Sequence, residues 1–242
     1  MARQDETSSI DAYASAHRQA EDLTVPDRVR ALLRRMPEGG TVLDVGCGDG
    51  MLLRAMAGAL EAKHAVLRGV DLSRVRVNRA RTRGAFEVAV DSAETLETVA
   101  DASIDLLVSS QVIEHVDDAK MAAAVARVLR PGGCAYLTTV FKRTWARYFY
   151  RSPGGWALDP THLREYQAKA PLFALFEARG LEIEGDALDP LAYPLVDPIL
   201  KRLGAFGARL GPRTLRAITR ARTLRLPIPG YFNWEVVLRR TP

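Results

Sequence analysis

The stretch Thr41-Val-Leu-Asp-Val-Gly-Cys-Gly-Asp-Gly50 decides the fold, because an apolar, β-branched run turns abruptly into three glycines at alternate positions. Glycine has no Cβ, so the backbone here can bend sharply and approach a ligand closely. The next stretch, Met51 to Leu60, reads as a helix, and the first N–H groups of a helix have no partner within it. We therefore expect a strand, a tight turn and a helix, with a ligand crevice at the turn.

Two acids restrict the kind of ligand that this turn can hold. Asp44 and Asp49 flank the glycines, and neither the G-x-G-x-x-G pattern of a dinucleotide loop nor the Lys-Ser/Thr ending of a phosphate-binding loop is present. Carboxylates beside a glycine turn suit a ligand with positive charge and hydroxyl groups. An ordinary strand-to-helix turn without a ligand is the alternative for this motif taken alone.

Four further apolar runs alternate with helical stretches. The runs are Ala65 to Val70, Phe86 to Val90, Ile104 to Ser109 and Cys134 to Val140. Alternating strands and helices predict a parallel α/β sheet, whose ligand crevice lies along the carboxyl ends of the strands. Asp71 ends the second run, where such a sheet binds ribose hydroxyls. Ser73 then has the position of a helix N-cap.

The motifs, taken in order, resemble those of class I S-adenosylmethionine-dependent methyltransferases. They are Val42 to Gly50, Val70-Asp71, Asp91 to Leu96, Asp105 to His115 and Leu129 to Gly133, within residues 25 to 187. The resemblance implies a Rossmann-like, doubly wound sheet of seven strands, mostly parallel, with an antiparallel last strand. That last strand would be Tyr231 to Leu238, between the fifth strand and the sixth, Leu181 to Leu188.

The resemblance also implies S-adenosyl-L-methionine as cofactor and assigns its contacts. In that family the glycine turn packs against the methionine part of the cofactor. The acid at the position of Asp71 accepts hydrogen bonds from both ribose hydroxyls. The acid at the position of Asp91 binds the adenine amino group, and the stretch Ser109 to Gln111 lines the sulfonium side. The expected cofactor-binding residues are Asp44, Gly46, Cys47, Gly48, Asp71, Leu72, Asp91, Ser92, Ala93, Ser109 and Gln111.

Histidines are the expected bases for the acceptor. The methyl group of a sulfonium is already activated as an electrophile, so that the enzyme mainly has to align the acceptor. When the acceptor is a hydroxyl, a nearby base helps by taking its proton. Two of the four histidines are candidates: His115 follows the fourth strand, and His162 lies in Asp159 to Tyr166 on an expected loop facing the crevice. His162 is placed slightly ahead. The expected catalytic residues are His162, His115 and Glu114.

Each of these candidates has a purely structural alternative. The pair Glu114-His115 can simply cap or orient a helix, and Thr161 with Glu165 can mark the start of one. The stretch Gln111-x-x-Glu114-His115 is similar to the Glu-x-x-Glu-His of ubiquinone-pathway O-methyltransferases, where the acids contribute to a metal site. Gln111 removes one charged ligand here, so that we expect no metal.

Composition indicates an ordinary globular protein. A chain of 242 residues with 48% hydrophobic and 26% charged residues fits one domain with additions. It has no apolar run of the roughly 18 residues that span a bilayer, and no pattern of a signal peptide at its start. Cys47 and Cys134 look like small buried residues rather than a disulfide. We expect a cytoplasmic protein, with peripheral contact with a membrane as the alternative.

The additions surround the expected crevice. Residues 1–36 form an N-terminal helical lid, in which Val25 to Met36 has helical spacing, and Ser9 to Asp22 either folds over the cofactor or frays. Insertions 141–164, rich in aromatic residues and arginine, and 189–230 would form the substrate cap. Long loops inside a compact domain are usually functional.

Basic residues gather within the second insertion. The stretch 201–225 holds eight cations and no acid, while the whole chain carries a net charge of +5. A solvated basic face over a packed one is the plain expectation. Contact with an anionic membrane is the sharper alternative, and we expect no nucleic acid, because Phe206 is the only aromatic residue for stacking.

The expected function is therefore methyl transfer from S-adenosylmethionine to a small-molecule acceptor, with oxygen as the favoured acceptor atom. The aromatic insertion suits a flat aromatic acceptor, and the basic insertion suits a lipid or isoprenoid quinone at a membrane surface. The remaining alternative is a cofactor-binding subunit that needs a catalytic partner.

Overall fold

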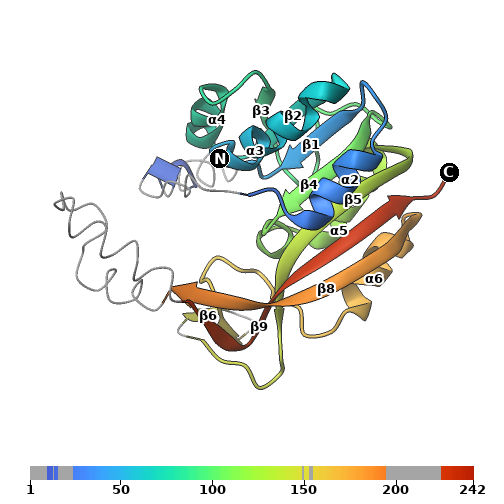
Figure 1. The fold of residues 1–242 in the computed structure, drawn as a ribbon. Helices are drawn as coiled ribbons and strands as arrows, with labels where there is room; N and C mark the ends of the chain where they lie inside the picture. Colours follow the sequence, from blue (N-terminus) through green and yellow to red (C-terminus); the bar gives the residue numbers. More distant parts are fainter. Residues whose placement is uncertain (1–9, 13, 16–23, 149, 153–154, 195–224) are drawn as a thin grey trace.

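The computed structural model describes residues 10–12, 14–15, 24–148, 150–152, 155–194 and 225–242. Its helices and strands alternate from α2 to β5 as the apolar runs predict, except that β4 follows β3 without a helix between them (Figure 1). The helices are α2 (Asp27–Arg35), α3 (Met51–Leu60), α4 (Arg74–Arg81), α5 (Asp118–Val128) and α6 (Ala170–Glu177), with short 3₁₀ helices η1 (Glu61–Lys63) and η2 (Ile113–His115). The strands are β1 (Thr41–Val45), β2 (Val66–Asp71), β3 (Glu87–Val90), β4 (Ile104–Ser110), β5 (Leu129–Lys142), β6 (Tyr150–Ser152), β7 (Gly155–Ala157), β8 (Leu181–Pro194) and β9 (Arg225–Arg240).

Seven strands form one sheet in the order β3-β2-β1-β4-β5-β9-β8. Strands β1 to β5 pair in parallel, and β9 pairs antiparallel with both β5 and β8. The predicted fold is therefore confirmed, including the antiparallel strand between the fifth and the last. The strand order reverses between β1 and β4, and a doubly wound sheet opens its ligand crevice at this point.

The outer hairpin is longer than the sequence analysis predicts. Strand β8 continues to Pro194 instead of ending at Leu188, and β9 already begins at Arg225. Pairing between the two strands persists through a register shift between Pro190 and Ala192, which pair with Phe232 and Pro227. Both ends of the expected insertion 189–230 are thus strand. Its basic residues from Lys201 to Arg222, like Tyr13, His17 and Arg18 near the N-terminus, lie outside the described residues.

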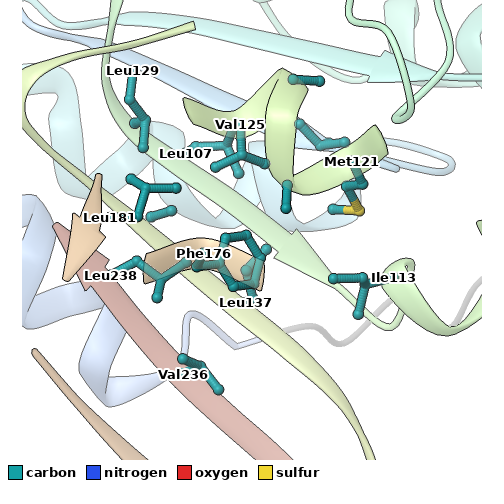
Figure 2. Packing of buried hydrophobic residues seen from close by; sticks show 14 of the residues in the cluster. Leu107, Ile113, Met121, Val125, Leu129, Leu137, Phe176, Leu181, Val236 and Leu238 are labelled. Atoms are coloured by element: carbon teal, nitrogen blue, oxygen red, sulfur yellow. The ribbon is translucent and has the colours of Figure 1, made fainter. Parts of the chain in front are cut away.

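Each face of the sheet buries its own apolar layer, because successive strand residues point to opposite sides. Leu43 of β1 and Leu107 of β4 pack on the α5 and α6 side, whereas Val42 and Leu106 pack on the side of α2, α3 and α4. Figure 2 shows the first layer, in which Val125 and Phe176 of the two helices lie close to strand residues. The core thus holds the sheet rigidly behind its carboxyl edge.

Local sequence explains where several elements begin. Ser73 caps α4 as predicted, since its hydroxyl accepts the N–H of Arg76 at 3.3 Å. Gly50 precedes α3 with a φ of 79°, in the left-handed region that glycine adopts without strain. Both cysteines are free thiols; Cys47 is buried, as expected, whereas Cys134 is only partly buried. Among the helices described, none is long and apolar enough to cross a membrane.

Trp234 gives a direct test of this packing. Its indole is fully buried against the rings of Phe141, Tyr166 and Phe173, at centroid distances of 5.5–5.8 Å, and its Nε1 donates to Asp186 Oδ2 at 2.9 Å. We expect Trp234→Ala to lower the free energy of unfolding by about 3–5 kcal/mol, as for other buried aromatic residues. Urea denaturation measures this change. Trp145→Ala is the matched control, because that side chain is 63% exposed, and equal losses in the two variants would contradict the packing.

Candidate functional site

A cavity of about 660 Å³ opens at the carboxyl edge of the sheet, where β1, β2, β3 and β4 end. Eight of the eleven expected cofactor residues line it: Gly46, Gly48, Asp71, Leu72, Asp91, Ser92, Ala93 and Gln111. The sequence thus brings these eight residues to one cavity, because each follows the end of a strand and parallel strands bring their ends to one edge. Their contacts with a cofactor stay predictions.

Three expected cofactor residues do not line the cavity. Asp44, Cys47 and Ser109 are buried beneath its floor, and the Ser109 hydroxyl donates to the carbonyl of Val45 at 3.0 Å. The neighbouring Ser110 faces the cavity instead, since adjacent residues of a strand point to opposite sides. Sequence motifs locate the end of the strand but do not say which of its two serines faces the ligand.

Asp71 is held in place by backbone groups. Its Oδ2 accepts the N–H of Gly48 and its Oδ1 accepts the N–H of Ser73, both at 2.9 Å. Burial raises the pKa of this carboxyl, while these two N–H groups and the nearby Arg76 act in the opposite direction. Each carboxylate oxygen has two lone pairs. The anchored side chain therefore keeps acceptor capacity for a vicinal diol such as that of a ribose.

Asp44 makes the floor beneath Asp71 electronegative. Burial, and then the charge of Asp71, raise its pKa to about 7, and its Oδ2 has no hydrogen-bond partner within the described part of the chain. Two carboxyls close together below a cavity disfavour anionic ligands and suit a cationic one. This agrees with the ligand class that the acids around the glycine turn predict.

Asp91 organises the loop that follows β3. Its carboxylate accepts the N–H groups of Ser92, Glu97 and Thr98 and the hydroxyl of Thr98, at 2.6–3.2 Å. The side chain thus fixes the loop 92–98, part of which lines the cavity. Its expected contact with an adenine amino group stays a prediction, next to this structural role.

The N-terminal residues that the structure describes lie against the same cavity. Ile10 lines it, and Asp11 Oδ1 accepts the hydroxyl of Ser73 at 2.6 Å. Arg79 Nη1 donates to the carbonyl of Ala14 at 2.8 Å. These bonds attach the segment to α4.

A group of titratable side chains lies beside the cavity, under η2. Glu114 is fully buried, and the rings of His115 and His162 meet edge to face with centroids 4.8 Å apart. His115 lines the cavity, whereas His162 is 6% exposed and lies behind it. The sequence analysis expects His162 to lie on a loop that faces the crevice, and this expectation is wrong for its side chain. The loop turns inward because the N–H of Leu163 donates to the carbonyl of Glu114 at 2.8 Å.

His162 is held by an acid that the sequence analysis does not assign. Its Nδ1 lies 2.8 Å from Glu165 Oε1, which also accepts the N–H of Leu158 at 2.5 Å, and Lys142 Nζ lies 3.1 Å from Glu165 Oε2. Burial opposes ionisation of Glu165, but the hydrogen bonds from His162, Leu158 and Lys142 lower its pKa. The spacing of three residues from His162 to Glu165 is the only signal in the sequence, and it resembles an ordinary helix start.

His115 is held by a second acid through a hydroxyl. Its Nδ1 lies 3.1 Å from Thr161 Oγ1, and that hydroxyl donates to Asp159 Oδ1 at 2.6 Å. Burial, and then the neighbouring His162, lower the pKa of His115. Both effects favour the neutral form of the ring. Helix α6 begins only at Ala170, so that Thr161 positions His115 rather than starting a helix.

Glu114 and Gln111 complete the group. Burial raises the pKa of Glu114 to about 7, and its Oε2 accepts the hydroxyl of Thr139 at 3.0 Å. Gln111 has a φ of 56°, a left-handed conformation that is uncommon for this residue type. In the amide orientation that suits its neighbours, its nitrogen donates to Glu114 Oε1 at 3.1 Å.

These side chains also provide a donor set for a metal ion. Glu114, His115 and His162 each offer one ligand atom, and these atoms lie within 4.8 Å of one another. One carboxylate and two imidazoles suit a divalent transition metal, and the Nδ1 contacts of both histidines are the kind of support that metal ligands receive. The residues thus fit a metal, although Gln111 stands where an acid would add a charged ligand.

Comparisons with known proteins agree with the fold and with the cavity. A family model described as a methyltransferase domain matches residues 16–185. The ubiquinone biosynthesis O-methyltransferase of Thiobacillus denitrificans is 35% identical over 122 residues, which are 48% of this chain and 51% of that protein. A probable S-adenosylmethionine-dependent methyltransferase of Mycolicibacterium smegmatis is 36% identical over 149 residues, covering 60% and 53%. The chain thus spans about half the length of these curated relatives.

Solved structures share the fold at lower identity. Phosphoethanolamine N-methyltransferase 2 of Haemonchus contortus, in complex with phosphomonomethylethanolamine and S-adenosylhomocysteine, superposes with a TM-score of 0.62 at 18% identity. The match covers 99% of this chain and 59% of that one. At this identity the likeness shows the fold alone.

Asp71 provides the test of the cofactor site. We expect Asp71→Ala to weaken binding of S-adenosylhomocysteine at least a hundredfold, since two charge-assisted hydrogen bonds to the ribose are lost at about 1.5–3 kcal/mol each. Isothermal titration calorimetry measures this, with circular dichroism to confirm folding. Asp105→Asn is the control, because that acid pairs with Arg130 near the start of β4, at the opposite edge. Unchanged affinity of the Asp71→Ala variant for S-adenosylhomocysteine would contradict a role of Asp71 in binding the ribose.

Proposed function

We propose, from the premise that the chain belongs to the methyltransferase domain family, that it methylates a hydroxyl oxygen of a small molecule with S-adenosylmethionine. His115 acts as the general base. The observation that carries this proposal is the hydrogen-bonded series from Asp159 through Thr161 to His115 at the wall of the cavity.

The series determines which nitrogen of His115 carries the proton. Thr161 has one hydroxyl proton, and at 2.6 Å it is donated to the carboxylate of Asp159. Thr161 Oγ1 can then only accept from His115, so that Nδ1 of His115 carries a hydrogen and Nε2 has a free lone pair. A neutral imidazole with an unprotonated Nε2 is the form that a general base requires.

The proposed reaction balances around this nitrogen. The acceptor oxygen forms a bond to the methyl carbon while the bond from that carbon to sulfur breaks. The hydroxyl proton passes to His115 Nε2, and the products are a methyl ether and S-adenosylhomocysteine. The positive charge of the sulfonium disappears as His115 becomes positive, and Asp159 stabilises this charge through Thr161.

Glu114 and His162 are placed as positioning residues. The ring of His162 stands edge-on to that of His115, at an interplanar angle of 72°, and Glu165 holds His162 from behind. Glu114 lies in the same buried group, where its hydrogen bond from Thr139 fixes one carboxyl oxygen. Neither side chain lines the cavity, so that they act on the acceptor through His115.

The surroundings favour an aromatic or isoprenoid acceptor. The end of β5 and the residues after it form an apolar group with β9, consisting of Val140, Ala146, Ile228 and Tyr231, with Tyr148 and Leu158 packed against it. The similarity to the Thiobacillus relative, an O-methyltransferase of ubiquinone biosynthesis, supports oxygen as the acceptor atom. A cofactor-binding subunit without activity of its own would bind S-adenosylmethionine but methylate none of these acceptors.

The test of the base compares three variants on a panel of catechols and alkylated hydroquinones. We expect His115→Gln to reduce kcat by about 10²–10⁴-fold, the usual contribution of a general base, with cofactor affinity unchanged. The Thr161→Val variant should have a much lower kcat than the wild type. The Thr161→Ser variant should keep most of the wild-type kcat, because serine keeps the bridging hydroxyl. Mass spectrometry of S-adenosylhomocysteine and the methylated product measures turnover. Equal activity of the valine and serine variants would contradict the role of the series.

Removal of metal separates the base from a Lewis acid at the same residues. With His115 as base, we expect dialysis against EDTA to leave turnover unchanged, and His162→Gln to cost less activity than His115→Gln. Loss of turnover in EDTA that Zn²⁺ or Mg²⁺ restores would instead assign Glu114, His115 and His162 to a metal ion.

A further inference from the structure

One lobe of the molecule contains basic residues but no acid. It consists of residues 143–158, 190–194 and 225–231, apart from 149, 153 and 154, which the structure does not describe. Within residues 143–158, 190–194 and 225–231 the sequence has no Asp or Glu, and it has four arginines, Arg143, Arg147, Arg151 and Arg225. In Figure 1 this acid-free lobe includes β6 and the beginning of β9, away from the C-terminus.

Contacts with the sheet fix the shape of the acid-free lobe. The N–H of Arg143 donates to the carbonyl of Gly230 at 2.8 Å, and Lys142 Nζ donates to the carbonyl of Trp156 at 2.6 Å. Ala146, Ile228 and Tyr231 are buried in its interior. The lobe is therefore packed against the sheet through its interior residues.

Large apolar side chains are exposed on the acid-free lobe. Trp145 is 63% exposed, Leu226 53% and Tyr150 41%, and together they are three of the five exposed large hydrophobic residues among those described. A Cβ at Gly230 would lie 3.0 Å from the Trp145 ring, so that the ring packs on this glycine while most of its surface meets solvent. Exposed apolar groups gathered on one lobe indicate a contact surface.

Two exposed arginines accompany these side chains. The guanidinium of Arg143 lies 6.0 Å and 5.6 Å from the ring centroids of Phe141 and Phe232. Within the described part of the chain, the ion pairs do not include Arg143 or Arg147. Their charge is therefore available to an external anion.

We propose that the acid-free lobe docks on the surface of an anionic phospholipid bilayer. Tryptophan and tyrosine prefer the level of the lipid headgroups, and arginines without neighbouring acids are attracted to the negative surface potential. Shallow insertion of Trp145, Tyr150 and Leu226 and attraction of Arg143 and Arg147 add together, as in other peripheral membrane contacts. The lobe carries this proposal without residues 201–222, whose membrane contact stays a separate prediction.

Docking would place the bilayer beside the acceptor side of the site. Lys142 joins the two regions, since it bonds to Trp156 of the lobe and to Glu165, which holds His162. An apolar acceptor dissolved in the membrane would then enter near His115. This consequence rests on the proposed function, but docking itself does not.

Vesicle sedimentation tests the proposal on the full chain. We expect binding to vesicles of phosphatidylcholine and phosphatidylglycerol, and little binding to phosphatidylcholine alone. The double variant Arg143→Ser/Arg147→Ser should lower the partition coefficient about 25-fold, as two arginines at an anionic surface each contribute a factor of about five. Trp145→Ser/Tyr150→Ser should lower it as well, and the emission of the wild-type protein should shift to the blue on binding.

The matched control removes the same charge elsewhere. Arg34→Ser/Arg54→Ser changes two exposed arginines, on α2 and α3, and should bind vesicles nearly as the wild type does. Circular dichroism confirms the fold of each variant, and cofactor titration shows whether the cofactor site is intact, independently of docking.

Three results would overturn the proposal. One is equal loss of vesicle binding in the control and lobe variants, which would indicate attraction by net charge alone. Another is loss only when Arg213, Arg216 and Arg220 are neutralised, which would move the contact to the basic stretch 201–225. The third is a dimer in sedimentation velocity that Trp145→Ser/Tyr150→Ser dissociates, which would make the lobe an interface between two copies.

Discussion

The close approach of Gly46 to Val112 is the constraint on which both halves of the site depend. A Cβ at Gly46 would lie 2.3 Å from Val112 Cγ2, and the N–H of this glycine donates to the carbonyl of Val70 at 2.8 Å. Only a residue without a side chain, at a φ of 75°, allows the ends of β1, β2 and β4 to meet here. Because Val112 lies between Gln111 and Glu114, this contact sets the acceptor residues directly beside the cofactor cavity.

The two sides of the cavity differ in their electrostatics, and the difference suits the proposed chemistry. Beneath the glycine turn, the paired carboxyls of Asp44 and Asp71 disfavour an anionic ligand and suit a cationic cofactor. On the acceptor side, burial and His162 favour the neutral form of His115, which lies at the end of a hydrogen-bonded series from Asp159. Positive charge can thus leave the sulfonium and reappear on an imidazole that an acid already stabilises.

Local patterns predict the fold and the cofactor side well but not the acceptor side. Asp71 and Asp91 follow apolar runs, and the ends of parallel strands necessarily meet, so that sequence order suffices to place them. The motif points to Ser109 and not to Ser110, because it does not reveal the face of a strand. The sequence favours His162 over His115 and gives no role to Glu165 and Lys142, because their positions follow from long-range loop contacts that have no periodic signal.

The tautomer of His115 is the central claim, and long-range ¹H–¹⁵N NMR of the protein labelled with ¹⁵N-histidine measures it most directly. In complex with S-adenosylhomocysteine at pH 7, the account predicts a neutral ring that carries its hydrogen on Nδ1, with Nε2 unprotonated. His115→Gln identifies the signal. A hydrogen on Nε2, or a ring protonated at both nitrogens, would contradict the role of His115 as base and the direction of the hydrogen bonds from Asp159.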